Sequence, residues 1–277
     1  MSRRYSTYTT LKYVTAVVLL LISVFPYIYM VLQSLAPWDQ VNKVFIPSRF
    51  TLRSYIWLFT GTEALVAKPW LRAFLNSVIV SVSSTTLMVL SAAIIGYALA
   101  KLPFRGRRLM YNFILFQMFY PAVILLIPTF LLVKAFGWFN TYWAMIVPKA
   151  MSVWAIFMYT SFFKSVPQEI IDSARVDGAS EWRIIFRIMI PLSKSITIIV
   201  ALFLFMARWE ELLWDLVVVQ DTSMRTLNVL LATIQSSYNP YPGPLYAAAT
   251  ILTLPILLVF LAFSRHFSQG IRLVLGK

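Results

Sequence analysis

Four charged side chains stand close together in an otherwise aliphatic stretch, and their types could do chemistry: Arg208, Glu210, Glu211 and Asp215. On a helix, Arg208 and Glu211 are three residues apart and could pair, whereas Glu211 and Asp215 carry like charges and need an outside partner. A charge at the middle of a hydrocarbon layer costs about 2.5 to 3.5 kcal/mol, so it tends to face protein or water. Two interpretations stay open. In one, Glu210 or Glu211 lines a hydrophilic cavity or a contact with a partner chain; in the other, the charges neutralise one another near the outer interface.

Two tryptophans flank these charges. Aromatic faces suit the surfaces of sugar rings, so Trp209 and Trp214 could stack on a carbohydrate, although helix packing or an interfacial belt is the commoner role for tryptophan. The residues that we take as candidates for a polar translocation path are Arg208, Trp209, Glu210, Glu211 and Trp214.

Other reactive chemistry is not indicated. The sequence has no cysteine, which excludes disulfides, thiolate metal sites and cysteine nucleophiles. Its one histidine, His266, has no HExxH-like spacing around it and is most simply interfacial. No Ser/His/Asp or Gly-x-Ser-x-Gly constellation supports a membrane-embedded enzyme. We therefore expect no catalytic residue, no metal site and no cofactor.

The composition indicates an integral membrane protein. Of 277 residues, 60% are hydrophobic and 12% are charged, and the mean hydropathy is +0.77. A soluble domain carries roughly 25% charged residues. The net charge of +14 could suggest nucleic-acid binding. However, the cations lie mostly between apolar blocks, where they set topology and contact lipid headgroups, so no nucleic-acid partner is expected.

Six apolar segments are long enough to cross about 30 Å of hydrocarbon as helices. They are approximately Leu11–Leu35, Ser77–Ala100, Leu109–Val133, Tyr142–Phe163, Ser195–Val219 and Leu245–Phe263. The first is too long for a signal peptide core and is expected to be an anchor. The sequence therefore predicts an all-α polytopic membrane protein with six transmembrane helices.

The distribution of lysine and arginine sets the orientation. With both termini in the cytoplasm, the inner side carries fifteen Lys and Arg residues and the outer side seven, as the positive-inside rule requires. The first outer loop, about 36–76, contains prolines and aromatics typical of an ordered cap. The second, about 220–244, ends in a turn signal at 239–244. No internal repeat or linker divides the chain, so we expect one membrane domain over residues 1–277.

Residues 164–194, which we call the inner segment, are the least hydrophobic long stretch. Pro167 starts the segment, and acidic residues follow it at the position where they complement a helix N-terminus. The turn dipeptide Asp177-Gly178 comes next, because glycine tolerates the positive φ that ends a helix. Residues 180–189 then show helical spacing. The pattern predicts two short helices joined at Gly178. A plain solvated loop is the alternative.

The inner segment resembles the EAA loop of bacterial ABC importer permeases. The string from Asp172 to Ser180, DSARVDGAS, is followed nine residues after Gly178 by IMIP. The family pattern reads E-A-A, three residues, G, nine residues and I-x-L-P, and the spacing here fits without a gap. Asp172, Ser173 and Ile190 replace the usual Glu, Ala and Leu.

The resemblance covers nearly the whole chain. The strings RAFLNS at 72–77, GYALAKLPFRG at 96–106, LP at 254–255 and RHFSQG at 265–270 also fit. Together they resemble the six-span permease of carbohydrate importers of the maltose/oligosaccharide type. Glu210 stands where the family commonly has Asn in Trp-Asn-Glu, and the tail at 270–277 matches only in part.

This resemblance implies a mechanism in which the chain itself does no chemistry. It implies a heterodimer with a second permease subunit, two ATP-binding subunits beneath it and an extracytoplasmic sugar-binding protein, all at the bacterial inner membrane. The inner segment would act as a cytoplasmic coupling helix that passes ATP-driven closure to alternating access. No Walker motif occurs, so the ATPase is a separate chain. The coupling residues that the motif implies are Glu169, Asp172, Ala174, Asp177, Gly178 and Ala179.

The main alternative is a secondary transporter or channel that works without nucleotide. Such transporters often show internal repeats, and none is visible in this sequence. The structured inner segment also counts against this alternative.

Overall fold

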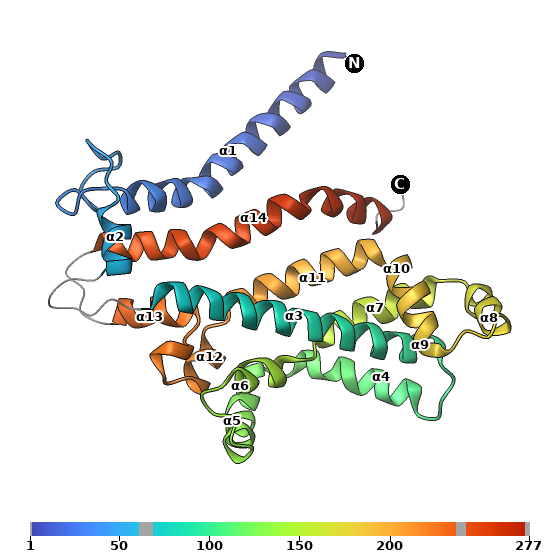
Figure 1. The fold of residues 1–277 in the computed structure, drawn as a ribbon. Coiled ribbons are helices and arrows are strands. Elements are labelled where there is room, and N and C mark those ends of the chain that lie inside the picture. The colour runs from blue at the N-terminus through green and yellow to red at the C-terminus, as the bar shows by residue number, and fades with distance from the viewer. Residues whose placement is uncertain (1, 61–68, 237–241, 275–277) are drawn as a thin grey trace. The chain divides into compact units, whose positions relative to one another are not determined.

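The computed structural model of this protein (Figure 1) describes residues 2–60, 69–236 and 242–274. Within these ranges all regular elements are helical and no strand occurs, which confirms the all-α prediction. The predicted turn at Asn239-Pro240-Tyr241 and the last residue of the tail, Lys277, lie outside the described residues.

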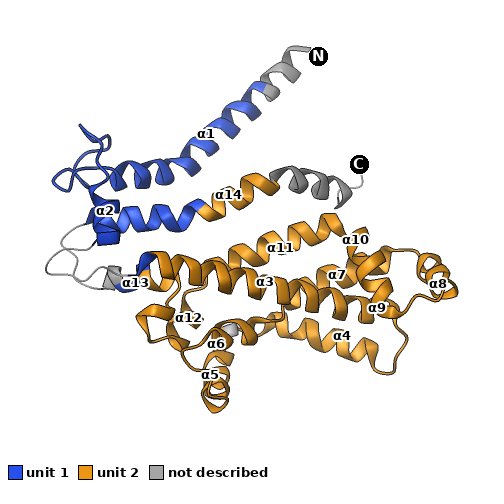
Figure 2. Cartoon of the chain, viewed as in Figure 1, with its two compact units in different colours: residues 1–70, 231–254 blue, residues 71–230, 255–277 orange. Residues whose placement is uncertain are grey.

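The chain divides into two compact units (Figure 2), namely Met1–Trp70 with Leu231–Leu254, and Leu71–Leu230 with Pro255–Lys277. The helices that belong wholly or mainly to the first unit are α1 (Ser2–Ser34) and α2 (Arg53–Thr60). Those of the second unit are α3 (Trp70–Lys101), α4 (Arg107–Phe116), η1 (Gln117–Phe119), η2 (Ala122–Leu125), α5 (Leu126–Ala135), α6 (Tyr142–Ile146), η3 (Val147–Lys149), α7 (Val153–Ser165), α8 (Gln168–Val176), α9 (Glu181–Ile184), the π-helical η4 (Ile185–Met189), α10 (Ile190–Leu192), α11 (Lys194–Trp209), α12 (Leu213–Val218) and η5 (Thr222–Met224). Both α13 (Leu227–Ser236) and α14 (Pro242–Val274) run from one unit into the other. The expectation of one membrane domain stays a prediction.

Three described helices are long and apolar enough to cross a membrane unbroken, and they match the predicted first, second and sixth spans: Thr10–Ser34, Trp70–Lys101 and Pro242–Phe263. Three further candidates are bent pairs of helices. The angle is 96° between α4–η1 and η2–α5, 41° between α6–η3 and α7, and 84° between α9–α10 and α11. The predicted third and fourth spans are therefore each broken into two helical pieces. The six-span topology with both termini inside stays a prediction.

Prolines lie at two of these breaks. Tyr120 is extended, with ψ of 123°, because a residue before proline is pushed out of the helical region, and Pro121 follows it. Pro148 lies in η3, after which the chain leaves the helix until Ser152 caps α7 by accepting a hydrogen bond from the Ala155 amide. Pro255, by contrast, lies inside α14 without ending it.

The core of the second unit is shared by α3, α7, α11 and the inner segment. Tyr97, Tyr159, Ile171 and Val200 come from these four parts of the chain, and all are fully buried in one apolar cluster. Gly96 allows the closest approach of α3 to α7, because a Cβ atom there would lie 2.7 Å from the Tyr159 Cβ. Small residues permit such close packing between membrane helices.

The N-terminal part of α3 holds the irregular backbone that follows α12. The Asn76 side-chain amide donates hydrogen bonds to the carbonyls of Ser223, at 2.9 Å, and Arg225, at 3.0 Å. One residue later, the Ser77 hydroxyl accepts a hydrogen bond of 2.7 Å from the Leu227 amide, which opens α13. Two adjacent side chains of α3 thus satisfy backbone groups that no helix satisfies.

The same helix holds the break before α7. The Ser91 hydroxyl donates to the Ala150 carbonyl at 2.9 Å. The Tyr142 hydroxyl, at the start of α6, donates to the Asn76 side-chain oxygen at 2.6 Å. Both ends of the α6–η3 piece are therefore fastened to α3.

Within the first unit, residues after α1 fold back on that helix. The Gln33 side chain donates to the Val44 carbonyl and accepts from the Asn42 amide, each at 2.8 Å. The Asn42 side-chain oxygen accepts from the hydroxyls of Tyr29, at 3.2 Å, and Tyr246 of α14, at 2.6 Å. This part of the predicted outer cap, between residues 36 and 60, is therefore ordered.

Replacing Gly96 by Ala should destabilise the protein, because the added methyl group meets the Tyr159 Cβ and forces α3 away from α7. Overpacking of this kind costs about 1 to 3 kcal/mol of the free energy of unfolding. Thermal unfolding of the purified protein in detergent would measure it. The control is Val82→Ile, which also adds one methyl group to α3 but at a side chain that is 49% exposed. Equal melting temperatures for the two variants would contradict the close approach.

Candidate functional site

The inner segment folds as two short helices around a tight turn, as its sequence predicts. Helix α8 ends at Val176, and Gly178 adopts φ of +76°, a left-handed conformation that favours glycine. The Gly178 amide donates to the Arg175 carbonyl at 3.0 Å and the Ala179 amide donates to the Ala174 carbonyl at 2.9 Å. These bonds satisfy the last carbonyls of α8. The turn is therefore a defined structure and the plain-loop alternative is wrong.

The six predicted coupling residues divide between two sides of the segment. Ala174 is buried and Ala179 is half-buried, and both pack on the apolar cluster shared with α3. The other four are exposed: Glu169, Asp172, Asp177 and Gly178. Val176 lies among these acidic residues with 87% of its surface exposed, although it is aliphatic. The end of α8 around Val176 and Asp177, which we call the tip, thus presents an exposed apolar side chain with carboxylates around it.

An ion-pair network that spacing alone did not reveal joins the turn to α3. The Arg175 guanidinium donates from Nε to Glu181 at 2.9 Å and from Nη1 to Asp172 at 3.2 Å. The hydrogen bond to Glu181 raises the pKa of Arg175 above its usual value. The Tyr97 hydroxyl of α3 donates to the second Glu181 oxygen at 2.5 Å. The only sequence signal was an arginine and a glutamate on either side of Gly178.

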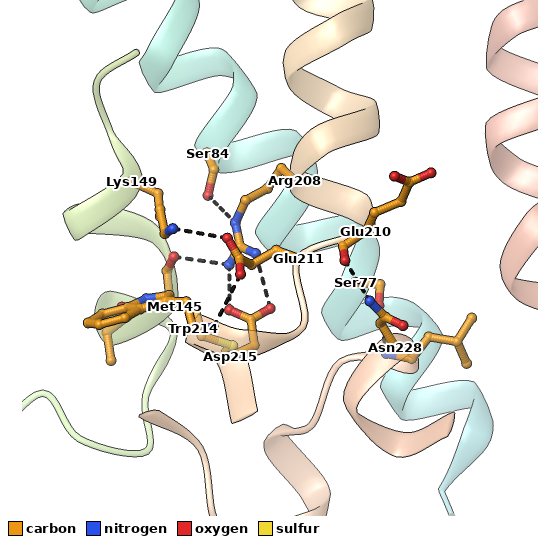
Figure 3. Close-up of polar contacts among 12 residues, drawn as sticks. Ser77, Ser84, Met145, Lys149, Arg208, Glu210, Glu211, Trp214, Asp215 and Asn228 are labelled. Atoms are coloured by element: carbon orange, nitrogen blue, oxygen red, sulfur yellow. Dashed lines mark hydrogen bonds and ion pairs between the residues drawn. The ribbon is translucent and has the colours of Figure 1, made fainter. Parts of the chain in front are cut away.

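The charged stretch at 208–215 lies at a break between helices (Figure 3). Helix α11 ends at Trp209, and α12 begins at Leu213. The predicted continuous helix over Ser195–Val219 was therefore wrong. The turn brings Arg208 and Asp215 into contact, whereas on a straight helix residues seven apart would be separated by about 10 Å along the axis.

Arg208 and Asp215 form a buried ion pair across this break. The two nitrogens Nη1 and Nη2 donate to the two Asp215 oxygens at 3.0 and 2.7 Å, and the side chains are 3% and 1% exposed. The remaining donors reach the Met145 carbonyl at 3.1 Å and the Ser84 hydroxyl of α3 at 3.4 Å. The pairing of Arg208 with Glu211 that a continuous helix would have allowed does not form, because the break turns Glu211 toward another cation.

That cation is Lys149, for which the sequence offered no partner. Its Nζ lies 2.9 Å from a Glu211 oxygen, with the side chains 37% and 22% exposed. The other Glu211 oxygen accepts from the Trp214 amide at 3.2 Å, and Lys149 also lies over the Trp214 ring at 5.9 Å from its centroid. The like charges of Glu211 and Asp215 therefore each have their own basic partner, as the spacing required.

Glu210 differs from its neighbour. Its side chain is exposed and points away from the ion pairs in Figure 3. Its backbone carbonyl accepts a 2.7 Å hydrogen bond from the Asn228 side chain of α13. The backbone of Glu210 is thus held within the break between α11 and α12, whereas its carboxylate projects away from the break.

Both tryptophans are packed inside the chain. Trp209 is 3% exposed and stacks on Phe205, with ring centroids 5.7 Å apart, and Phe74 meets it edge to face at 5.9 Å. Trp214 is 4% exposed, and its indole nitrogen donates to the Ala144 carbonyl at 3.0 Å. These contacts favour the packing role over sugar stacking for both residues. Among the described residues, no group of three or more His, Cys, Asp or Glu side chains could hold a metal ion.

Comparison with known proteins gives consistent results. The profile of a family described as "Binding-protein-dependent transport system inner membrane component" matches residues 92–273. The chain is 33% identical over 255 residues to the arabinooligosaccharides transport system permease protein AraQ of Halalkalibacterium halodurans, with 90% of each chain covered. It is 31% identical over 249 residues to the lactose transport system permease protein LacG of Rhizobium radiobacter, covering 90% of this chain and 89% of that one.

A solved structure shares the fold. It is a chain of a bacterial ABC transporter involved in the import of the acidic polysaccharide alginate, with a TM-score of 0.81 and 22% sequence identity. The match covers 96% of this chain and 99% of that chain.

Replacing Asp215 by Ala should strongly destabilise the protein, because it leaves the Arg208 guanidinium buried without a counter-charge. Removing one partner of a buried pair costs about 3 to 5 kcal/mol, whereas replacing both by apolar residues is often neutral. The double variant Arg208→Met with Asp215→Leu should therefore recover most of the melting temperature that the single variant loses.

The half-exposed pair supplies the control. Lys149→Met should cost only about 1 kcal/mol or less, because exposed ion pairs contribute little. A double variant no more stable than Asp215→Ala, or an Asp215→Ala protein as stable as the wild type, would show that the buried pair does not hold the break.

Proposed function

This chain belongs to the family of binding-protein-dependent transport system inner membrane components, and on that premise we propose that it imports sugars or oligosaccharides as one permease of an ATP-driven ABC importer. Family membership makes the chain a multi-pass permease of the inner membrane and leaves no support for a nucleotide-independent channel. The carbohydrate class is supported by relatives named for arabinooligosaccharides and lactose. The glycan that stimulates ATP hydrolysis in the purified assembly would identify the substrate.

The partners follow from the same proposal. A second permease subunit completes the pore as a heterodimer, two ATP-binding subunits supply the energy, and an extracytoplasmic sugar-binding protein delivers the substrate. The chain carries no Walker motif, so its own role is non-catalytic. The predicted orientation, with both termini and the inner segment in the cytoplasm, would put the Gly178 turn within reach of an ATPase.

The observation that carries the proposal is the shape of this turn. Val176, at 87% exposure, is an aliphatic side chain presented to solvent by a turn with fixed hydrogen bonds. A single exposed aliphatic residue is common on protein surfaces. Here the fixed turn that carries Val176 and the carboxylates around it make the surface suited to a protein contact. Glu169, Asp172 and Asp177 surround it and would meet basic groups on the ATPase. Ala174 and Ala179 pack behind the turn, and Gly178 supplies the backbone conformation that shapes it.

Glu210 is our candidate for the wall of the translocation path. The described part of the chain offers its carboxylate no ion pair, and a charge in an apolar segment is favourable only against water or a polar partner. A carboxylate is also a good acceptor for sugar hydroxyls. Arg208, Glu211, Trp209 and Trp214 would support the wall from behind, because their side chains are engaged within the chain.

Cross-linking tests the docking directly. The protein has no natural cysteine, so Val176→Cys introduces a single attachment point at the tip. A bifunctional reagent on that cysteine should capture the ATP-hydrolysing subunit in membranes. Leu109→Cys on α4, 76% exposed, is a control site that should not capture it. Adding Gly178→Pro should reduce capture, because proline fixes φ near −65° and cannot adopt +76°. Failure of Val176→Cys to capture an ATPase would contradict the proposed coupling.

Neutralising Glu210 tests the path. Glu210→Gln should lower sugar uptake about tenfold, the effect of weakening one hydrogen bond to a charged group, while the protein stays as stable as the wild type. Glu211→Gln is the matched variant: it weakens the pair with Lys149 and should lower the melting temperature as well. Measured uptake and ATP hydrolysis unchanged in Glu210→Gln would remove this residue from the path.

A further inference from the structure

Helix α3 holds both ends of the turn region of the inner segment. The Lys101 Nζ donates to the Val166 carbonyl at 2.6 Å, just before α8. The Tyr97 hydroxyl donates to Glu181, the first residue of α9, at 2.5 Å. Tyr97 and Lys101 are four residues apart and so lie on the same face of α3. The chain between Val166 and Glu181 is thus fastened at its start and at its end to one turn of one helix.

Glu181 also connects the two arms of the turn to each other. One of its oxygens accepts from Tyr97, and the other accepts from the Arg175 Nε in the last turn of α8 at 2.9 Å. Arg175 in turn pairs with Asp172, one turn earlier on α8, at 3.2 Å. A single carboxylate therefore joins α3, α8 and α9.

The surroundings make this connection stiff. Tyr97 is fully buried, with its ring edge to face against Phe163 at 6.4 Å between centroids. Ile171 of α8 and Ile184 of α9 are also fully buried in the same cluster. The phenol can turn only with its packed neighbours, and a shift that separated its hydroxyl from Glu181 would leave a buried donor without its partner, at a cost.

The connection to the next helix along the chain is different. Helix α11 follows the inner segment in sequence, but α9–α10 meets it at an angle of 84°, with the helix interrupted at Ser193. Residues Ile185–Met189 before that bend are π-helical, a form that is rare and often marks functional sites. Along the chain, the turn is therefore connected to α11 through a π-helix and a sharp bend. Its connection to α3 consists of hydrogen bonds made directly by the turn region.

We propose that α3, rather than α11, receives the movement of the docked turn, and that Tyr97 and Glu181 are the positioning residues that transmit it. This inference rests on the proposed coupling to an ATPase. When ATP binding displaces α8, the contact through Glu181 moves α3 in the same direction. The broken helical segments that are hydrogen-bonded to α3 then move with it. The bend at Ser193 lets α11 change its angle to the segment in the same step.

Removing one hydroxyl group tests the Tyr97–Glu181 hydrogen bond, which we call the joint. Tyr97→Phe keeps the ring and its packing but loses the bond to Glu181, and in proteoliposomes containing the whole transporter, sugar uptake per ATP hydrolysed should fall about tenfold. The matched control is Tyr159→Phe. It removes a buried tyrosine hydroxyl from the same cluster, one that donates to Thr197 at 2.8 Å and does not touch the turn. Tyr159→Phe should leave uptake per ATP unchanged.

Two variants of Glu181 sharpen the test. Glu181→Ala removes the acceptor of both Tyr97 and Arg175 and should uncouple at least as strongly as Tyr97→Phe. Adding Tyr97→Phe to it should have no further effect, because the acceptor of the tyrosine hydroxyl is already gone. Glu181→Gln keeps one oxygen that can accept from the Tyr97 hydroxyl and should restore part of the uptake per ATP. A merely stabilising role would lower protein yield in both tyrosine variants without changing this ratio.

The outcomes separate the two proposals. Capture of the ATPase by Val176→Cys, combined with wild-type uptake per ATP in Tyr97→Phe and Glu181→Ala, would overturn the joint and leave the docking proposal standing. Equal uncoupling by Tyr97→Phe and Tyr159→Phe would also overturn it. Loss of capture in the otherwise unchanged chain would overturn the docking proposal itself.

Discussion

Unpaired backbone groups cannot be left in hydrocarbon, and the second unit of this protein is arranged around that constraint. A hydrogen-bonding group without a partner costs several kcal/mol there, so irregular backbone at membrane depth must find partners within the protein. Here α3 is the unbroken helix that supplies many of them. Asn76 and Ser77 hold the backbone before α13, Ser91 holds the break before α7, and Lys101 holds the start of the inner segment. A permease that must change conformation can keep its breaks, because one continuous helix satisfies them.

The buried charges at the α11–α12 break follow from the same requirement. Arg208 uses its guanidinium on Asp215, on the Met145 carbonyl and on Ser84 of α3. Its charge is thus neutralised and its donors are occupied at almost complete burial. Lys149 and Glu211 form a second, wetter pair beside the first. Glu210, the residue that we propose for the translocation path, is exposed beside these two pairs.

Local features of the sequence predicted local features of the structure. The turn at Gly178 was predictable, because a helix end, a glycine and a second helical pattern lie within a few residues of one another. Pro121 and Pro148 lie at the breaks in the predicted third and fourth spans. The pairs Arg208–Asp215, Lys149–Glu211 and Tyr97–Glu181 were not predictable, since each depends on a bend or on a contact between distant parts of the chain. The continuous helix expected over 195–219 failed for the same reason: its break is stabilised by partners on α3 and α6–η3, which periodicity does not reveal.

We expect the inner segment and α3 to move as one body when the docked turn is displaced. Pulsed electron resonance between spin labels on Val176→Cys, at the tip of the turn, and Leu90→Cys, on the exposed side of α3, measures it most directly in a chain without natural cysteines. We expect the same distance distribution in the nucleotide-free and the ATP-trapped transporter, while a label on α11 at Phe203→Cys changes its distance to Val176→Cys. A nucleotide-dependent shift between Val176→Cys and Leu90→Cys would contradict the claim.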